Sequence, residues 1–471
     1  MLQTVLRNGG RRFSGTVRYL ARGAQDSHFK STKSRWEALN SLASEADLDL
    51  LKRNDFKGIR GRENTVEIQS SQPEIGLAKL QEHYQKNFRI PADTILDVVL
   101  RLEANEQGVT NSLKSASARW LPLLIGSCGL QMSHLDVKSR SAILDRLWQQ
   151  INRLEMPIDI ESSNTRLRVF LENEIPFDAN KELASIQEQR GLVPNQKTFQ
   201  LLLEQLARTG DPDRCKEMVY KMANQGCIID ADCNASLVYC FTLRGFQKKV
   251  ESLIESSATK FGRGAWIQAQ GACALAATVR GDMDLLRSVL RRSVDQEKQL
   301  LLPYTTSFDI IWQLAKNSGK QYGFSRNIQL IEQIMQHMNR NRGYFRYLGR
   351  EVERHISQEY YYTAVALLDN VAKMSEYMLK QQKSMYVRQV MARMARQMIR
   401  SRVPMDTVKD IANRISANFK SPQIIQHELL YGLLTFREFS MDERIDRVAA
   451  MLDTVDPRRE RTHLILPLLT A

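Results

Sequence analysis

The chain has 471 residues, of which 67 are Lys or Arg and 53 are Asp or Glu, with 43% hydrophobic and 25% charged residues. This composition excludes an intrinsically disordered chain, because enough apolar residues are present to build a core. Neither a long uninterrupted apolar run nor an alternating apolar and polar run occurs, so we expect an all-α protein without a membrane span.

The first 25 residues carry five arginines and no acidic residue, with apolar residues, serine and threonine between them. This pattern is typical of a mitochondrial transit peptide; a basic tail that binds nucleic acid is the alternative. Residues 1–35 hold eight basic residues and one acidic residue, net +7 of the chain's +14, so a mature protein would be only moderately basic. Phe13-Ser14 and Leu20-Ala21 are both candidate cleavage points. Residues 36–72 are expected to form a flexible linker.

Regular helical patterning begins at Pro73, and we expect residues 73–159 to form helical hairpins. Within this region, apolar residues recur with a helical period in three segments: Thr94–Leu102, Trp120–Cys128 and Ala142–Leu154.

Gln196–Asp230 shows most clearly how the chain is organised. Its first half places four apolar residues on one helical face: Phe199, Leu202, Leu203 and Leu206. Gly210 breaks this pattern, and Asp211 followed by Pro212 is suited to start a second helix. The apolar face of that helix comprises Cys215, Met218, Val219 and Met222. Two such short helices cannot bury their apolar faces alone, so similar hairpins are expected on either side.

A glycine recurs between the paired helices, as Gly210, Gly245 and Gly281, at intervals of 35 and 36 residues. Ile160–Asn195 has the same outline, with Glu174 in the place of the glycine. A fixed period in this range predicts an α-solenoid of stacked helical hairpins, roughly nine or ten in all. We expect the clearest repeats in residues 160–301, and degenerate repeats with basic helices in residues 302–471.

The residues that would carry catalysis or bind a metal do not occur in a suitable pattern. The six cysteines form no C-x-x-C pair and the seven histidines lie far from them in sequence, so buried free thiols are expected. No phosphate-binding loop, dinucleotide fingerprint, nucleophile elbow or zinc-protease motif is present. We therefore expect no enzyme activity, no metal, no cofactor and no small-molecule substrate.

Three short segments resemble a pentatricopeptide repeat: Pro194-Asn195 through Thr198-Phe199, Arg208-Thr209-Gly210-Asp211, and Met222 to Gly226. That family binds single-stranded RNA with one base per repeat. Further segments resemble the N-terminal part of a leucine-rich subfamily of animal mitochondria: Arg89-Ile90-Pro91, Leu123 through Gly129, and Asn164 through Glu174. This resemblance runs from about Arg89 to Gly281. Proteins of the subfamily are usually longer than this chain, which leaves an isoform, a paralogue or a form with fewer functions as alternatives.

The resemblance implies a mitochondrial matrix protein that binds messenger RNA, protects it, and supports its polyadenylation and translation. A small protein with an RNA-recognition motif is the implied partner. In the wider family, the fifth and the last residue of a repeat select the base. Mapped onto this chain, the pairs are Asn164 with Asn195, Gln200 with Asp230, and Ala235 with Trp266.

Of these pairs, only Asn164 with Asn195 is a favoured combination, one that would prefer a pyrimidine. Gln200 with Asp230 is unusual, and Ala235 has no side-chain hydrogen-bond donor. Weak base selection is therefore expected. The alternative is that Asn164 and Gln200 are merely exposed polar residues at helix starts.

Two basic clusters further along are candidates for phosphate contacts. Three arginines fall on one helical stripe with aromatic residues between them: Arg342, Arg346 and Arg350. Three more lie opposite a methionine face: Arg393, Arg396 and Arg400. The alternative for the first cluster is a solvated face above inward-packed Phe345 and Leu348. For the second, an acidic partner or a membrane surface is the alternative.

We therefore expect a non-catalytic RNA-binding protein of mitochondria. The alternative is a helical-repeat scaffold that holds a partner protein. The weak base-selecting pairs and the moderate charge of the mature chain favour this second interpretation.

Overall fold

The computed structural model describes residues 73–85, 90–189, 191–295, 299–319, 326–338, 342–373, 380–418, 423–436 and 438–452. The predicted transit peptide, its cleavage points and the linker of residues 36–72 lie outside the described residues. Within the described ranges every regular element is a helix, apart from two isolated bridges that join Val294 to Leu300 and Leu300 to Met338. The predicted all-α solenoid of stacked hairpins is confirmed.

The N-terminal helices are α5 (Pro73–Gln85), α6 (Ala92–Glu103), α7 (Gln107–Ser115), α8 (Ser117–Ser127) and α9 (Val137–Arg153). Three of them, α6, α8 and α9, correspond to predicted segments. The sequence does not predict α7, because glycine, valine, threonine, asparagine and serine are weak helix formers. Its buried Val109 and Leu113 show that packing, not intrinsic preference, stabilises this helix.

The middle of the chain forms α10 (Ile160–Glu172), α11 (Ala179–Ala184) with the π-helical turn Ser185–Gln189, α12 (Gln196–Thr209), α13 (Pro212–Asn224), α14 (Ala231–Arg244), α15 (Gln247–Phe261), α16 (Arg263–Arg280) and α17 (Met283–Arg292). The predicted boundary between α12 and α13 is correct in detail. Gly210 has a φ of 66°, and the Asp211 carboxylate accepts hydrogen bonds from the backbone N–H groups of Asp213 and Arg214.

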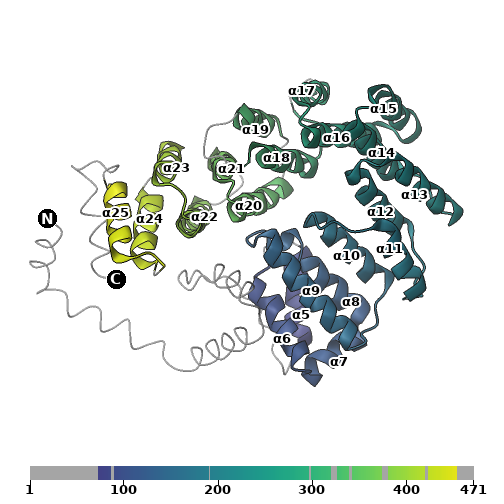
Figure 1. The fold of residues 1–471 in the computed structure, drawn as a ribbon, viewed down its shortest axis with the longest axis horizontal. Coiled ribbons are helices and arrows are strands. Elements are labelled where there is room, and N and C mark those ends of the chain that lie inside the picture. Colours follow the sequence, from purple (N-terminus) through teal and green to yellow (C-terminus); the bar gives the residue numbers. More distant parts are fainter. Residues whose placement is uncertain are drawn as a thin grey trace, which may run out of the picture. The chain divides into compact units, whose positions relative to one another are not determined.

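The first helices of successive hairpins pack against one another in the order α10, α12, α14 and α16, while the second helices cover one side of them (Figure 1). The predicted faces of α12 and α13 are buried, except that Val219 is only half-buried against the same core. The other seven are each at most 4% exposed: Phe199, Leu202, Leu203, Leu206, Cys215, Met218 and Met222. Leu201 and Ala207 of α12 are buried as well. A first helix therefore has neighbours on several sides, which a single apolar stripe does not predict.

The hairpin pattern continues through α18 (Tyr304–Ser318), α19 (Arg326–His337), α20 (Arg342–Ser357), α21 (Tyr361–Lys373), α22 (Lys380–Arg400), α23 (Met405–Asn418), α24 (Gln423–Thr435) and α25 (Met441–Leu452). Here α18, α20, α22 and α24 pack in succession, and so do α19, α21, α23 and α25. One apolar cluster extends from Val238 to Met451, and a second lies around α11 to α14.

A residue with positive φ follows the first helix in seven of the described hairpins, and it is not always glycine. Gly210, Gly245, Gly281 and Gly319 take this position after α12, α14, α16 and α18. Glu174, Glu359 and Arg402 take it after α10, α20 and α22, with φ values of 54°, 67° and 51°. The repeated feature is thus a left-handed turn residue, so the glycine spacing alone underestimates how far the repeats extend.

Glu155, which follows α9, tests the cost of such a turn. Its φ is 45° and its side chain is exposed. Replacing it by glycine removes the clash of Cβ with the backbone, which outweighs the entropy that glycine adds to the unfolded chain. We expect Glu155→Gly to raise the free energy of unfolding by about 0.5–1 kcal/mol in urea denaturation. Gly210→Ala is the converse control and should lower it; a stabilising Gly210→Ala would contradict the argument.

Candidate nucleic-acid interface

The first predicted base-selecting pair is brought together by the structure, near the start of two successive first helices. Asn164 on α10 is 2% exposed. Its Nδ2 donates to Asn195 Oδ1 at 3.1 Å, and its Oδ1 accepts from Thr198 Oγ1 at 2.8 Å. Asn195 also caps α12 by accepting from the Thr198 N–H. Asn164 is therefore not the exposed polar residue of the alternative interpretation: it joins two repeats.

The second predicted pair is also in contact. Gln200 Nε2 donates to Asp230 Oδ2 at 2.6 Å, and Gln196 Nε2 donates to the same oxygen at 3.0 Å. The other carboxylate oxygen caps α14 by accepting from the Cys233 N–H at 3.1 Å. Burial opposes ionisation of Asp230, but these hydrogen bonds outweigh it and hold the pKa of the carboxyl below its usual value. The second predicted pair therefore carries a negative charge.

The third predicted pair has different surroundings. Ala235 is 8% exposed on α14. Trp266 is half-buried on α16 and lines a cavity that residues of α15 and α17 also border.

Four further polar residues, which were not among the predicted site residues, lie beside these pairs or continue them along the repeats: Gln196, Thr198, Asp232 and Gln268. Gln268 Nε2 on α16 donates to Asp232 Oδ1 on α14, in the preceding repeat. The sequence spacing could have identified three of them, because Gln196, Asp232 and Gln268 recur every 36 residues, each in the N-terminal half of the first helix of its repeat. We call these four, together with Asn164, Asn195, Gln200 and Asp230, the polar row. Its members hydrogen-bond from one repeat to the next.

Because Asn164 joins α10 to the cap of α12, its removal should affect stability. Asn164→Ala removes the nearer of the two acceptors of the buried Thr198 hydroxyl, leaving Asn195 Oδ1 at 3.1 Å, and it also removes the donor to Asn195. We expect the free energy of unfolding to fall by about 1–2 kcal/mol in urea denaturation without RNA. Gln200→Ala, at a half-buried position, should cost less. An Asn164→Ala protein as stable as the native chain would contradict these contacts.

Of the arginine stripe on α20, the structure describes the side chain of Arg350, which lies beside core aromatic residues. For Arg342, Phe345 and Arg346 it describes the helix but not the side chains. The guanidinium of Arg350 lies 3.9 Å above the ring of Tyr347, and that ring stacks on Phe308 at 5.5 Å. Leu348 is fully buried, as the alternative interpretation expects. Tyr347 therefore contributes to packing in the position where an RNA base would need a free ring.

Two arginines of α22, Arg393 and Arg396, make ion pairs with the neighbouring first helices. The methionine face opposite them comprises Met391, Met394 and Met398, which are fully buried. Arg393 pairs with Glu353 of α20, and Arg396 Nη2 lies 3.5 Å from Glu428 Oε2 of α24. Arg400 is half-buried on the same helix. Phosphate contacts of Arg393 and Arg396 would therefore compete with ion pairs inside the protein.

Glu174, the residue in the place of the repeat glycine, makes contacts far along the chain. Its carboxylate accepts from Trp312 Nε1 at 2.7 Å and from Lys316 Nζ at 2.6 Å, both on α18. Burial opposes ionisation, yet the hydrogen bonds and the charge of Lys316 lower the pKa of Glu174. Because this repeat has a glutamate where others have glycine, its turn carries a carboxylate that binds α18 of a distant repeat.

A buried polar cluster surrounds this contact. Arg354 Nη1 lies 3.3 Å from Glu351 Oε2, and its guanidinium lies 3.9 Å above the ring of Trp312. Arg140 of α9 is 1% exposed and donates to the carbonyl of Gly129 at 3.2 Å; burial lowers its pKa to about 10. We call Arg140, Glu174, Trp312, Lys316, Glu351 and Arg354 the polar junction. Charged residues in it come from α9, α18, α20 and the turn after α10.

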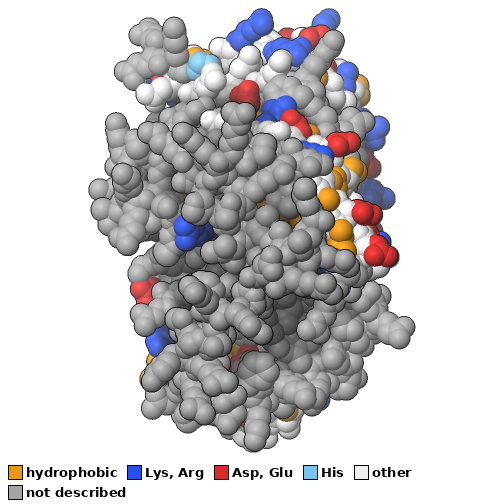
Figure 2. All heavy atoms as spheres, turned by 90° about the vertical axis from the view of Figure 1, so that its left-hand side faces the viewer, with side chains coloured by type: hydrophobic (Ala, Val, Ile, Leu, Met, Phe, Trp, Pro, Cys, Tyr) orange, Lys and Arg blue, Asp and Glu red, His pale blue; other side chains and the backbone are white. Residues whose placement is uncertain are grey.

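The described surface offers mixed charge. On the face drawn in Figure 2, basic and acidic side chains lie intermixed in the part that is not grey.

All six cysteines are free thiols and five are buried, as predicted. Within the described ranges, no group of three or more His, Cys, Asp or Glu side chains is arranged to hold a metal, and none of the helices combines the length and apolar character needed to cross a bilayer.

Comparison with known proteins gives partial matches. No known protein-family profile matches the chain. A stretch of 103 residues is 29% identical to the protein named "Leucine-rich PPR motif-containing protein, mitochondrial" of Xenopus tropicalis. This stretch covers 22% of the present chain and 7% of that protein. The mouse protein of the same name is 30% identical over 89 residues, which cover 19% of this chain and 6% of that protein. These matches support a relationship to pentatricopeptide-repeat proteins over about a fifth of the chain.

Proposed function

We propose that this chain is a non-catalytic single-stranded RNA-binding protein of the mitochondrial matrix. Its ligand would be mitochondrial messenger RNA, which it would stabilise or prepare for polyadenylation or translation, together with a small partner that carries an RNA-recognition motif. The relatives named above are mitochondrial proteins with PPR motifs, and the predicted transit peptide agrees with that compartment.

The observation that carries this proposal is the contact within each of two predicted pairs in the polar row. Asn164 lies against Asn195 and Gln200 against Asp230, with amide groups at the same place in consecutive hairpins. Such a row could present one amide per repeat to successive bases of a single strand. Because these amides already bond one another, a base would have to replace an internal hydrogen bond, so we expect modest affinity and weak base selection.

The test is fluorescence anisotropy of a labelled single-stranded RNA with the full chain, alone and with the partner, at several salt concentrations. If phosphate contacts form, the logarithm of the affinity should fall linearly with the logarithm of salt, by about 0.7 per phosphate neutralised. Gln200→Ala should weaken binding, whereas Gln225→Ala, an exposed glutamine at the end of α13, should not. Affinity that is absent or insensitive to salt would refute the proposal.

A protein scaffold is the second candidate, favoured by the charge of the row. Asp230 and Asp232 place carboxylates in the row to which RNA would bind, and Arg393 and Arg396 of α22 are engaged in ion pairs. Crosslinking in isolated mitochondria distinguishes the two: enriched messenger RNA supports the first, and a co-purifying protein in equal amount without RNA supports the second.

A further inference from the structure

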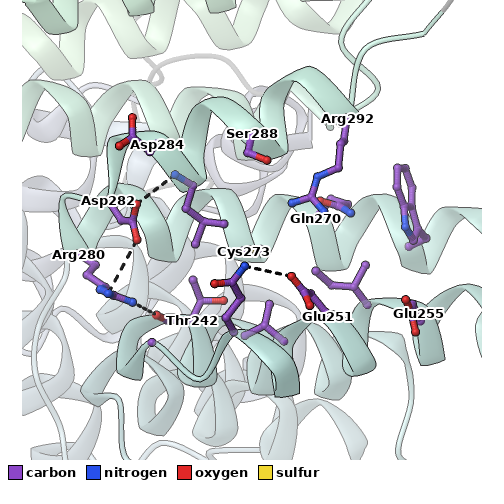
Figure 3. Close-up of a pocket in the computed structure, with 16 residues that line it drawn as sticks. Thr242, Glu251, Glu255, Gln270, Cys273, Arg280, Asp282, Asp284, Ser288 and Arg292 are labelled. Carbon is purple, nitrogen blue, oxygen red and sulfur yellow. Dashed lines mark hydrogen bonds and ion pairs between the residues drawn. The ribbon is translucent and has the colours of Figure 1, made fainter.

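A cavity of about 550 Å³ lies between α15 and α17, above α16. Figure 3 shows Asp284 and Arg292 along α17 on one side, Glu251 and Glu255 along α15 on the other, and Gln270 of α16 between them. The residues from each helix recur at helical spacing, so each helix presents one stripe to the cavity. The space is therefore an elongated groove between two second helices, and it is separate from the polar row.

Gln270 at the base of this groove has an unsatisfied hydrogen-bond acceptor. The residue is 2% exposed, and its Oε1 makes no hydrogen bond within the described structure. A buried acceptor without a partner is unfavourable, so an occupant that supplies an N–H or O–H group here would gain affinity.

The charges of the groove favour a cationic occupant. Glu251, Glu255, Asp282 and Asp284 line it, against Arg280 and Arg292. Arg280 already has partners in the protein: its Nη2 lies 3.8 Å from Asp282 Oδ2, and its Nη1 donates to the Thr242 carbonyl oxygen at 3.4 Å. Arg292 is then the one remaining arginine of the groove lining for the two carboxylates of α15, Glu251 and Glu255. RNA phosphates would be repelled there, whereas a lysine or arginine side chain would be attracted.

Apolar side chains complete the site. Val250 and Ile254 of α15, Leu285 of α17 and the half-buried Trp266 of α16 line the same space. Pockets that bind ligands combine such an apolar lining with a few polar groups that fix orientation. The groove therefore fits an apolar group next to a positive charge.

We propose that this groove binds a segment of a partner protein in which a lysine or arginine lies beside an apolar side chain. The cation contacts Glu251 and Glu255, a donor of the segment bonds Gln270 Oε1, and the apolar side chain packs against Ile254 and Leu285. Such a segment docks in the manner of an amphipathic helix in a groove. This site does not depend on the proposed RNA function, because it uses none of the polar row.

The probe is a short fluorescein-labelled peptide of leucine and lysine with helical periodicity, titrated with the full chain and followed by anisotropy. Its leucine–glutamate counterpart tests the charge requirement. Glu251→Gln with Glu255→Gln should weaken binding of the lysine peptide about fivefold or more, because two partly screened ion pairs are lost. The matched control is Asp213→Asn with Glu217→Gln, two exposed carboxylates at the same spacing on α13, which should leave affinity unchanged. Gln270→Met should also weaken binding.

Hydrogen exchange locates the bound peptide independently. Backbone amides of α15 and α17 should exchange more slowly in the presence of the lysine peptide, while those of α13 should not change. Equal binding of the glutamate peptide, native affinity in the Glu251/Glu255 double variant, or protection elsewhere in the chain would each overturn the proposal. So would a uridine homopolymer that protects α15 and α17, since it would identify the groove as an RNA site.

Discussion

Replacing Arg354 by methionine is expected to lower the free energy of unfolding by about 3–5 kcal/mol, because it leaves a buried carboxylate without its cation. Glu351 is fully buried, and its Oε2 lies 3.3 Å from Arg354 Nη1. Burial alone would lower the pKa of Arg354, but Glu351, Asp309 and Glu174 together raise it, so the guanidinium is held in its charged form. Methionine retains the packing length but none of this charge.

The control replaces both partners. Glu351→Leu combined with Arg354→Met removes the uncompensated charge, and this double variant should recover most of the lost stability. Urea denaturation followed by circular dichroism gives the unfolding free energies of the native chain, the single variants and the double variant. A single Arg354→Met variant that is as stable as the double variant would show that Glu351 is not desolvated as the structure indicates.

The polar junction also explains why local unfolding should spread in this variant. Arg354 lies on Trp312, and Trp312 donates to Glu174 in the turn after α10. Weakening this contact should speed hydrogen exchange in α18 and in the end of α10, although residues 174 and 312 are 138 positions apart.

Contacts within a repeat could be predicted from the sequence because they depend on short spacings. The apolar stripes of α12 and α13 and the turn at Gly210 with its cap at Asp211 follow from local residue chemistry. The expected pairs in the polar row follow from the resemblance to pentatricopeptide repeats, which implies them at the fifth and the last residue of a repeat.

Contacts between distant repeats could not be predicted in this way. Nothing near Glu174 in the sequence indicates that its partners lie on α18, because a repeat period describes neighbours only. The burial of Asn164 and the pairing of Arg393 with Glu353 likewise depend on which side of a helix its neighbours cover. Phosphate-binding and structural arginines have the same appearance in sequence; only their partners distinguish them.

The second large effect concerns pH and a buried histidine. His355 is fully buried; its Nδ1 donates to the Glu351 carbonyl at 2.7 Å and its ring packs edge-on against Trp312 at 5.1 Å. Burial lowers the pKa of His355 from 6.5 to about 4, although the charge of Glu351 opposes this. Between pH 6.5 and about 4 the unfolded chain therefore binds a proton that the folded chain excludes. The free energy of unfolding consequently decreases as the pH is lowered through this range.

Comparison with His355→Asn isolates this effect, because asparagine retains a donor for the Glu351 carbonyl but does not titrate. Between pH 7 and pH 4 the native chain should lose about 3 kcal/mol more than the variant, corresponding to the shift of its pKa. The measurement is the difference in urea unfolding free energy at each pH. A difference that stays constant over this range would show that His355 titrates in the folded chain as it does in the unfolded chain.

The native chain alone would conceal part of this loss. The side chain of Asp309 is still 44% exposed, but its partial desolvation and the charges of Glu351 and Glu204 raise its pKa from 3.8 to about 6. The folded chain therefore takes up a proton there before the unfolded chain does, and stability rises as the pH falls through this range. The two groups act in opposite directions over almost the same interval. In the comparison with His355→Asn the Asp309 contribution is common to both proteins and cancels. In an Asp309→Asn background, the histidine effect should appear directly as a steeper acid loss than in the native chain, whereas an unchanged slope would mean that Asp309 titrates normally.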